Sequence, residues 1–172
     1  MSKTIQSFFK KVIDVIELVT GILCQVLLVG VVIMGITGIL TRYLPVRQPI
    51  WLGQMAIFLG VWMYFLGFVI SAKREEYIFI EYFHKFIPPL IGRVIDIVFH
   101  VAMIVFCIVN VVGGWPLQIL QRKMMVPSFP LPQNFFSLSI IVSMGLIALI
   151  LLYHTWMRVL DLRQFLIHKN AE

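Results

Sequence analysis

Two histidines are the residues whose type and spacing could support chemistry in this chain. His100 follows Asp96 by four residues, and His154 precedes Arg158 by four. If the surrounding segments are antiparallel helices, both imidazoles lie about 6 Å inside the same membrane boundary, given a rise of about 1.5 Å per residue. Such a pair could supply the axial ligands of a b-type haem, as in the membrane anchor of a cytochrome. The commoner alternative is that each histidine lies near a helix end and bonds to backbone or water.

No other combination of residues typical of catalysis is present. The sequence has no P-loop, no Gly-x-Ser-x-Gly, no His-Glu-x-x-His and no Cys/His metal spacing. Cys24 and Cys107 fall in apolar segments, where a free cysteine acts as a small apolar filler. A small multidrug exporter would need a glutamate within a span, but Glu17 lies at the boundary of its segment. We therefore predict that the chain is not an enzyme and has no catalytic, metal-binding or cofactor-binding residues.

Four long stretches without any Asp, Glu, Lys or Arg indicate the helices on which the two histidines lie and the other membrane-spanning helices. They cover 18–41, 48–72, 97–121 and 124–157. A helix needs about 20 apolar residues to cross a hydrocarbon core of about 30 Å, so each stretch is long enough to span a membrane. With 60% apolar residues and a mean hydropathy of +0.97, the chain is predicted to be an all-α integral membrane protein with four transmembrane helices.

Glycine and proline indicate where the spans end within a single domain of residues 1–172. Gly113-Gly114-Trp115-Pro116 would kink or loosen the third helix. Prolines at positions 127, 130 and 132 exclude regular helix across 126–132, so the last stretch begins with a loop. The predicted spans lie near 18–41, 49–72, 94–115 and 134–157.

The segment between the second and third spans is predicted to form an interfacial amphipathic helix near 75–87. Apolar residues between Ile78 and Leu90 recur at helical spacing, while the charged residues lie largely elsewhere. Such a helix lies in the headgroup plane and would brace the bundle against the membrane. A short solvated helix is the alternative.

Basic residues predict the orientation of the chain. Ten of the 14 lie on the side of the two termini and the loop between the second and third spans, and four lie on the other side. The positive-inside rule therefore places both termini in the cytoplasm. A count of net charge would give the opposite answer, but the rule counts basic residues, and acidic residues contribute little to it. The formal net charge is +6, but the basic residues are scattered around the span ends and form no basic stripe. No nucleic-acid partner is therefore expected.

Two sets of residues are candidates for contacts with a partner or with lipid. Gly53, Gly60 and Gly67 recur every seven residues, so they share one face of the second span and could form a seam for close helix packing. The partner of this seam could be internal or another protein, and glycine is also simply frequent in membrane helices. Aromatic side chains are expected to anchor the chain at the membrane interfaces, namely Trp51, Phe79 and Trp156.

The stretch from Arg42 to Glu81 resembles the small membrane subunit of TRAP transporters, of the DctQ type. The resemblance lies in an ordered combination of residues and not in one diagnostic motif. The combination comprises Arg42-Tyr43, Pro45, Pro49, Trp51, Trp62, Phe65-Leu66-Gly67, Lys73-Arg74, Ile78 and Glu81. The chain departs from the family pattern at Gln54, where an acidic residue is frequent, and at Tyr77, where histidine is frequent.

The resemblance implies a non-catalytic scaffold subunit of a tripartite, sodium-driven importer in the bacterial inner membrane. In such a system a periplasmic substrate-binding protein delivers an organic acid, either a dicarboxylate or a sugar acid such as sialic acid. A large permease subunit, expected here as a separate chain, carries substrate and sodium in an elevator-like movement, and the small subunit stabilises and anchors it. Basic residues on the outer side could contact the binding protein or, as the alternative, lipid headgroups. These are Arg42, Arg47, Arg122 and Lys123.

Overall fold

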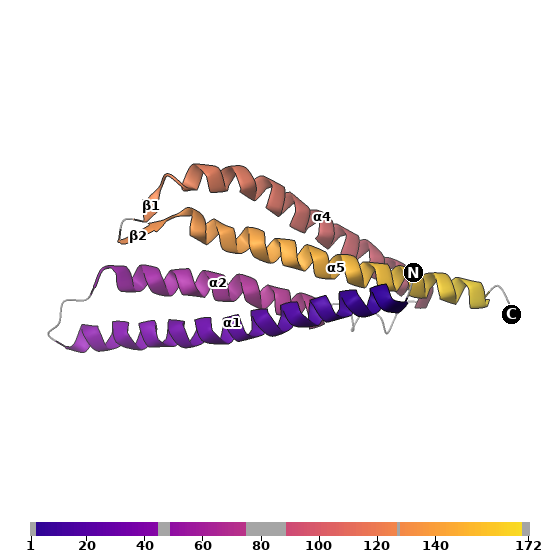
Figure 1. Ribbon diagram of the computed structural model, residues 1–172, viewed down its shortest axis with the longest axis horizontal. Helices are drawn as coiled ribbons and strands as arrows, with labels where there is room; N and C mark the ends of the chain where they lie inside the picture. The colour runs from indigo at the N-terminus through magenta and orange to yellow at the C-terminus, as the bar shows by residue number, and fades with distance from the viewer. Residues whose placement is uncertain (1–2, 45–48, 75–88, 127, 170–172) are drawn as a thin grey trace.

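Four long helices make up most of the chain in the computed structural model, which describes residues 3–44, 49–74, 89–126 and 128–169 (Figure 1). Within these residues each helix contains a window long and apolar enough to cross a membrane, which confirms the predicted all-α membrane fold with four spans. The helices are α1 (Lys3–Tyr43), α2 (Trp51–Arg74), α4 (Pro89–Gln121) and α5 (Asn134–Lys169). The predicted interfacial helix near 75–87, with Phe79, lies outside the described residues.

The helices pack side by side in the order α1, α2, α5, α4 (Figure 1). The main contacts join α1 to α2, α2 to α5, and α5 to α4. The chain therefore forms two antiparallel helical hairpins, and α2 and α5 join them at the centre. We call the end where α1 and α4 begin the termini end, and the end where α5 begins the hairpin end.

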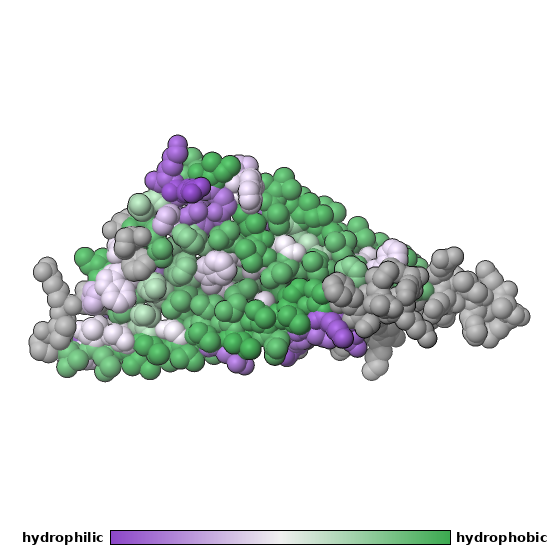
Figure 2. Space-filling view, viewed as in Figure 1, coloured by the Kyte–Doolittle hydropathy of each residue, from purple (hydrophilic) through white to green (hydrophobic). Residues whose placement is uncertain are grey.

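The best-buried apolar side chains lie toward the termini end, where the helices converge in Figure 1. One cluster contains residues from all four helices: Ile13, Val69, Ala72, Ile104, Cys107, Ile147, Ile150 and Leu151. Most other large apolar side chains of the spans remain exposed. Because lipid is as apolar as a protein interior, such exposure is the expected state of a membrane helix. Figure 2 shows the corresponding hydrophobic surface, with hydrophilic residues gathered mainly toward the two ends.

Helix α4 begins at a proline and continues through another. Pro89 occupies its first position, where the missing N–H costs nothing. The helix runs through Gly113-Gly114-Trp115-Pro116 to Gln121, beyond the predicted end near 115. An internal proline removes one backbone hydrogen bond, and membrane helices tolerate this when neighbouring groups compensate.

A short β-hairpin connects α4 to α5. Strands β1 (Met125–Val126) and β2 (Phe129–Pro132) pair antiparallel with an irregular register. No helix forms across the proline-containing segment among the residues described there, as the prolines predict. The strand pairing was not predicted. Prolines are compatible with it because a two-stranded ribbon consists only of edge strands.

Candidate partner and membrane contact sites

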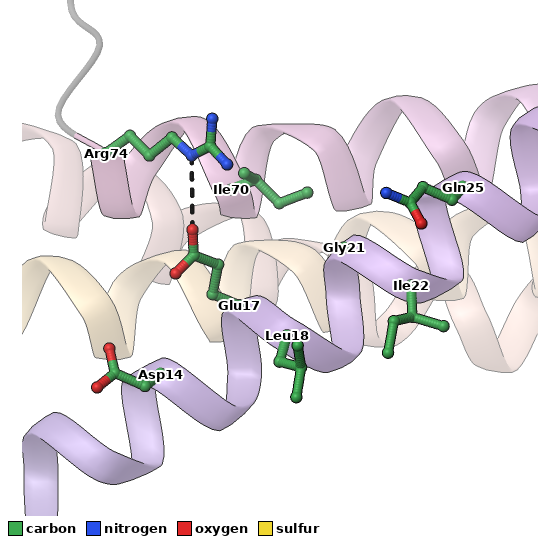
Figure 3. Close-up of a pocket in the computed structure, with 8 residues that line it drawn as sticks. All are labelled: Asp14, Glu17, Leu18, Gly21, Ile22, Gln25, Ile70 and Arg74. Atoms are coloured by element: carbon green, nitrogen blue, oxygen red, sulfur yellow. Dashed lines mark hydrogen bonds and ion pairs between the residues drawn. The ribbon is translucent and has the colours of Figure 1, made fainter.

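An ion-pair cluster joins α1 and α2 at the termini end. Lys73 Nζ lies 2.7 Å from Asp14 Oδ1 and also bonds to a carboxylate oxygen of Glu17. Arg74 Nε lies 3.5 Å from Glu17 Oε1 (Figure 3). The antiparallel hairpin brings the start of α1 beside the end of α2, so residues more than 50 positions apart in sequence can pair. Sequence reasoning missed this cluster, although both segments were expected at one membrane boundary.

A second ion pair joins α4 and α5 at the same end. Arg158 Nη1 lies 2.8 Å from Asp96 Oδ2, and the side chains are 28% and 13% exposed. His100 is 3% exposed, and its Nδ1 lies 2.8 Å from the carbonyl oxygen of Asp96 in the preceding turn. Each hairpin thus has its own ion pairs between helices, and the charged groups lie at the ends of the spans.

The packing around His100 and His154 does not support a haem between them. In the turns that follow His100, Ile104 and Cys107 are buried in the same cluster as Ile150 and Leu151 of α5. Apolar side chains therefore pack α4 directly against α5 beside the two histidines. The local bond of His100 to a backbone carbonyl matches the commoner role considered from the sequence, that of a histidine near a helix end.

Gly53, Gly60 and Gly67 border open space. A Cβ atom added at any of them would meet no heavy atom within 4 Å, apart from the immediate chain neighbours and the backbone of the helix itself. The three glycines therefore do not mediate close packing between the described helices. If they form a seam, its partner lies outside the described part of this chain.

Close helix approaches occur at two other glycines. A Cβ added at Gly30 of α1 would lie 3.1 Å from Leu59 Cδ1 of α2. One added at Gly114 of α4 would lie 3.0 Å from Ile141 Cγ1 and 3.2 Å from its Cδ1 on α5. Each glycine thus permits close contact within one hairpin, a role that the sequence spacing did not reveal.

Basic residues predicted to face the outer side gather at the hairpin end. Arg42 lies in the last turn of α1, and Arg122 and Lys123 directly follow α4; all three are exposed. The sequence has no carboxylate between 18 and 74 or between 97 and 160, so the cationic character of this end is not balanced locally. Arg47 lies outside the described residues.

Two of the three predicted interfacial aromatic residues are described, and both are exposed. Trp51 begins α2 and is 41% exposed, and Trp156 lies in α5 and is 51% exposed. Trp51 is at the hairpin end, and Trp156 lies toward the termini end. Their positions suit contact with opposite membrane interfaces, where tryptophan is enriched.

Polar side chains connect α4 to α5 at the hairpin end. Gln118 Nε2 donates to the backbone oxygen of Asn134 at 2.9 Å, and Ser137 Oγ bonds to Gln121 Oε1. Such bonds between helices contribute modestly in membranes, about 0.6 kcal/mol on average. They hold the start of α5 against the end of α4 beside the β-hairpin.

Comparison with known proteins gives one family match. A family model described as the DctQ component of tripartite ATP-independent periplasmic transporters matches residues 28–161. The matched region begins within α1 and ends within α5, so it includes all of α2 and α4. No match was found among curated proteins.

Proposed function

The chain belongs to the DctQ family and is a small permease component of a TRAP transporter, and on this premise we propose that it is the non-enzymatic scaffold of a sodium-coupled importer. The family works together with a large permease and a substrate-binding protein. In this proposal the chain stabilises and anchors the large, elevator-type subunit in the bacterial inner membrane. The imported substrate is an organic acid, either a dicarboxylate or a sugar acid such as sialic acid.

The distribution of ionisable residues is the observation that best supports a scaffold. No Asp, Glu, Lys or Arg occurs in 18–41, 48–72, 97–121 or 124–157. Ionisable groups within a span usually mark pathways for ions, protons or substrates, and the two histidines in these stretches, His100 and His154, lie near the ends of their stretches. The described ion pairs instead join helices near the ends of these stretches. Charge in this chain thus serves to hold helices together, and the transport steps belong to the large permease.

The arrangement of the helices also suits a scaffold. Helices α2 and α5 are central, so each packs against two neighbours, whereas α1 and α4 lie at the outer edges. A row of this kind leaves broad apolar surfaces for contact with lipid or another membrane subunit. Gly53, Gly60 and Gly67 offer one such contact, because nothing described in the chain fills the space beside them. We assign this glycine face to the large permease.

Orientation follows from the positive-inside rule, with both termini in the cytoplasm. The termini end of the bundle then faces the cytoplasm and the hairpin end faces the periplasm. In this orientation Arg42, Arg122 and Lys123 are exposed where the substrate-binding protein would dock. Exposed cations at the rim of an interface mainly change the association rate and its dependence on salt. Contact with phospholipid headgroups is the competing role for these residues.

Co-purification of the large permease with the tagged chain tests the scaffold proposal. Gly60→Leu should reduce recovery of the permease, because a large side chain would keep the permease helix away from the seam. Gly35→Leu on α1 is the matched control, since a Cβ there also meets nothing within 4 Å and the site lies outside the seam. Equal recovery with both variants would reject the assigned glycine face, and no recovery even with the unmodified chain would reject the scaffold function.

A further inference from the structure

A groove of about 410 Å³ lies between α1 and α2 at the termini end (Figure 3). Its volume is within the range of about 300–1,000 Å³ typical of small-molecule sites. The polar lining consists of Asp14, Glu17 and Gln25 from α1 and Arg74 from α2. Leu18, Ile22 and Ile70 supply apolar walls. The groove therefore combines a charged mouth with an apolar interior along the membrane-spanning part of α1.

The charged mouth carries both signs. Asp14 and Glu17 contribute two carboxylates, and the neighbouring Lys73 and Arg74 contribute two cations. Only Oδ1 of Asp14 bonds to Lys73 among the described residues, and 53% of that side chain stays exposed. The Arg74 side chain is 57% exposed. A ligand that approaches from the membrane thus meets an accessible acceptor beside an accessible guanidinium.

Gln25 places one polar group deeper in the groove. It lies two helical turns beyond Glu17, about 12 Å along the axis, within a stretch that contains no charged residue. A helical side chain points back toward the start of its helix, and Figure 3 shows the Gln25 amide directed toward Gly21. Gln25 is exposed, and its amide makes no hydrogen bond to another residue that the structure describes. An amide that faces lipid at this depth gains from a polar partner outside the described part of the chain.

We propose that this groove binds a phospholipid with an ammonium headgroup, namely phosphatidylethanolamine, in the leaflet where α1 begins. The lipid phosphate accepts hydrogen bonds from Arg74, and its ammonium donates to Asp14. An ester carbonyl below the phosphate accepts from the Gln25 amide. One acyl chain then lies along Leu18, Gly21 and Ile22, where a Cβ added at Gly21 would meet nothing within 4 Å.

The composition of the mouth distinguishes this lipid from the other common ones. Phosphatidylglycerol could also place its phosphate at Arg74, but its headgroup carries no cation to pair with Asp14. Phosphatidylcholine has the right charges, but its quaternary ammonium has no N–H to donate to Asp14. Phosphatidylethanolamine matches both the charges and the donors, and charge-assisted hydrogen bonds are the stronger class.

Lipid selection by the full-length chain tests the site. The chain is reconstituted in nanodiscs with equal amounts of phosphatidylethanolamine, phosphatidylcholine and phosphatidylglycerol, and retained lipid is then measured by native mass spectrometry after mild detergent extraction. We expect preferential retention of phosphatidylethanolamine. Arg74→Gln and Asp14→Asn should each reduce it about tenfold, which is the effect of one lost charge-assisted hydrogen bond on a binding constant. Equal retention of the three lipids by the unmodified chain would overturn the proposal.

Gly21→Leu tests the groove itself without removing a charge. Leucine at this position fills open space, so the fold should tolerate it while the acyl chain is excluded. Gly35→Leu, at an equally open position of α1 outside the groove, should retain the lipid. Unchanged retention in a helical Gly21→Leu variant would overturn the proposal. Loss of the lipid when the large permease is co-expressed would assign the groove to a helix of that partner instead. The retention measured with this chain alone does not bear on the scaffold function.

Discussion

Replacing Gly114 by alanine tests how closely α4 approaches α5. The new Cβ would lie 3.0 Å from Ile141 Cγ1 and 3.2 Å from its Cδ1, both shorter than ordinary van der Waals contact. Ile141 is only 9% exposed, and a β-branched side chain in a helix is restricted at χ1, so its Cγ1 cannot move away easily. Overpacking of this kind costs about 1–3 kcal/mol.

Gly113→Ala is the matched control for this variant. A Cβ at Gly113 meets nothing within 4 Å, whereas both variants gain the same helix propensity, about 1 kcal/mol. That gain cancels in the comparison, so Gly114→Ala should be less stable than Gly113→Ala by about 1–3 kcal/mol. The assay is the free energy of unfolding in bicelles, measured by steric trapping.

A double mutant identifies the contact that is responsible. Ile141→Ala removes both atoms that the new Cβ would approach, so it should recover about 1 kcal/mol of the destabilisation caused by Gly114→Ala, beyond additivity. Equal stability of the Gly113 and Gly114 variants would refute the close approach of the two helices. Additive effects of Gly114→Ala and Ile141→Ala would show that Ile141 is not the side chain that limits it.

Three further perturbations test other parts of the structure. Arg158→Ala should lower the unfolding free energy by about 1–3 kcal/mol, because Asp96 loses its 2.8 Å partner; an unchanged value in the same assay would contradict the pair. Ile150→Ala should cost about 2–5 kcal/mol, because this fully buried side chain leaves a cavity among all four helices, and a cost below 1 kcal/mol would contradict the core. Reversing the charges of Arg122 and Lys123 to glutamate should slow docking of the binding protein and weaken its salt dependence in surface plasmon resonance, whereas unchanged kinetics would favour headgroup contact.

The four spans could be predicted from the sequence because the cost of burying charge in lipid applies to every helix in the same way. The arrangement of the helices could not. Between Glu17 and Arg42 the first helix has no charged residue and few polar ones, so its pattern does not show which side meets α2. Gly30 and Gly114 are close-packing positions, yet Gly53, Gly60 and Gly67, with their regular spacing, border open space.

The positions of the prolines predicted only part of the backbone structure around them. The prolines correctly excluded helix at the described residues of 126–132, but they gave no sign of the strand pairing between Met125 and Pro132. Pro116 was expected to mark the end of a span, and α4 continues past it to Gln121. The bonds from Gln118 to Asn134 and from Ser137 to Gln121 hold this last part of α4 against α5. Contacts of this kind depend on the tertiary structure and leave no periodic signal in the sequence.

Uptake by reconstituted proteoliposomes tests the scaffold function most directly. Vesicles contain this chain, the large permease or both, and the substrate-binding protein with a radiolabelled organic acid is added outside under an inward sodium gradient. We predict uptake only when both membrane chains are present, and none with this chain alone. Uptake by this chain without the permease, or full uptake by the permease without this chain, would contradict the scaffold function.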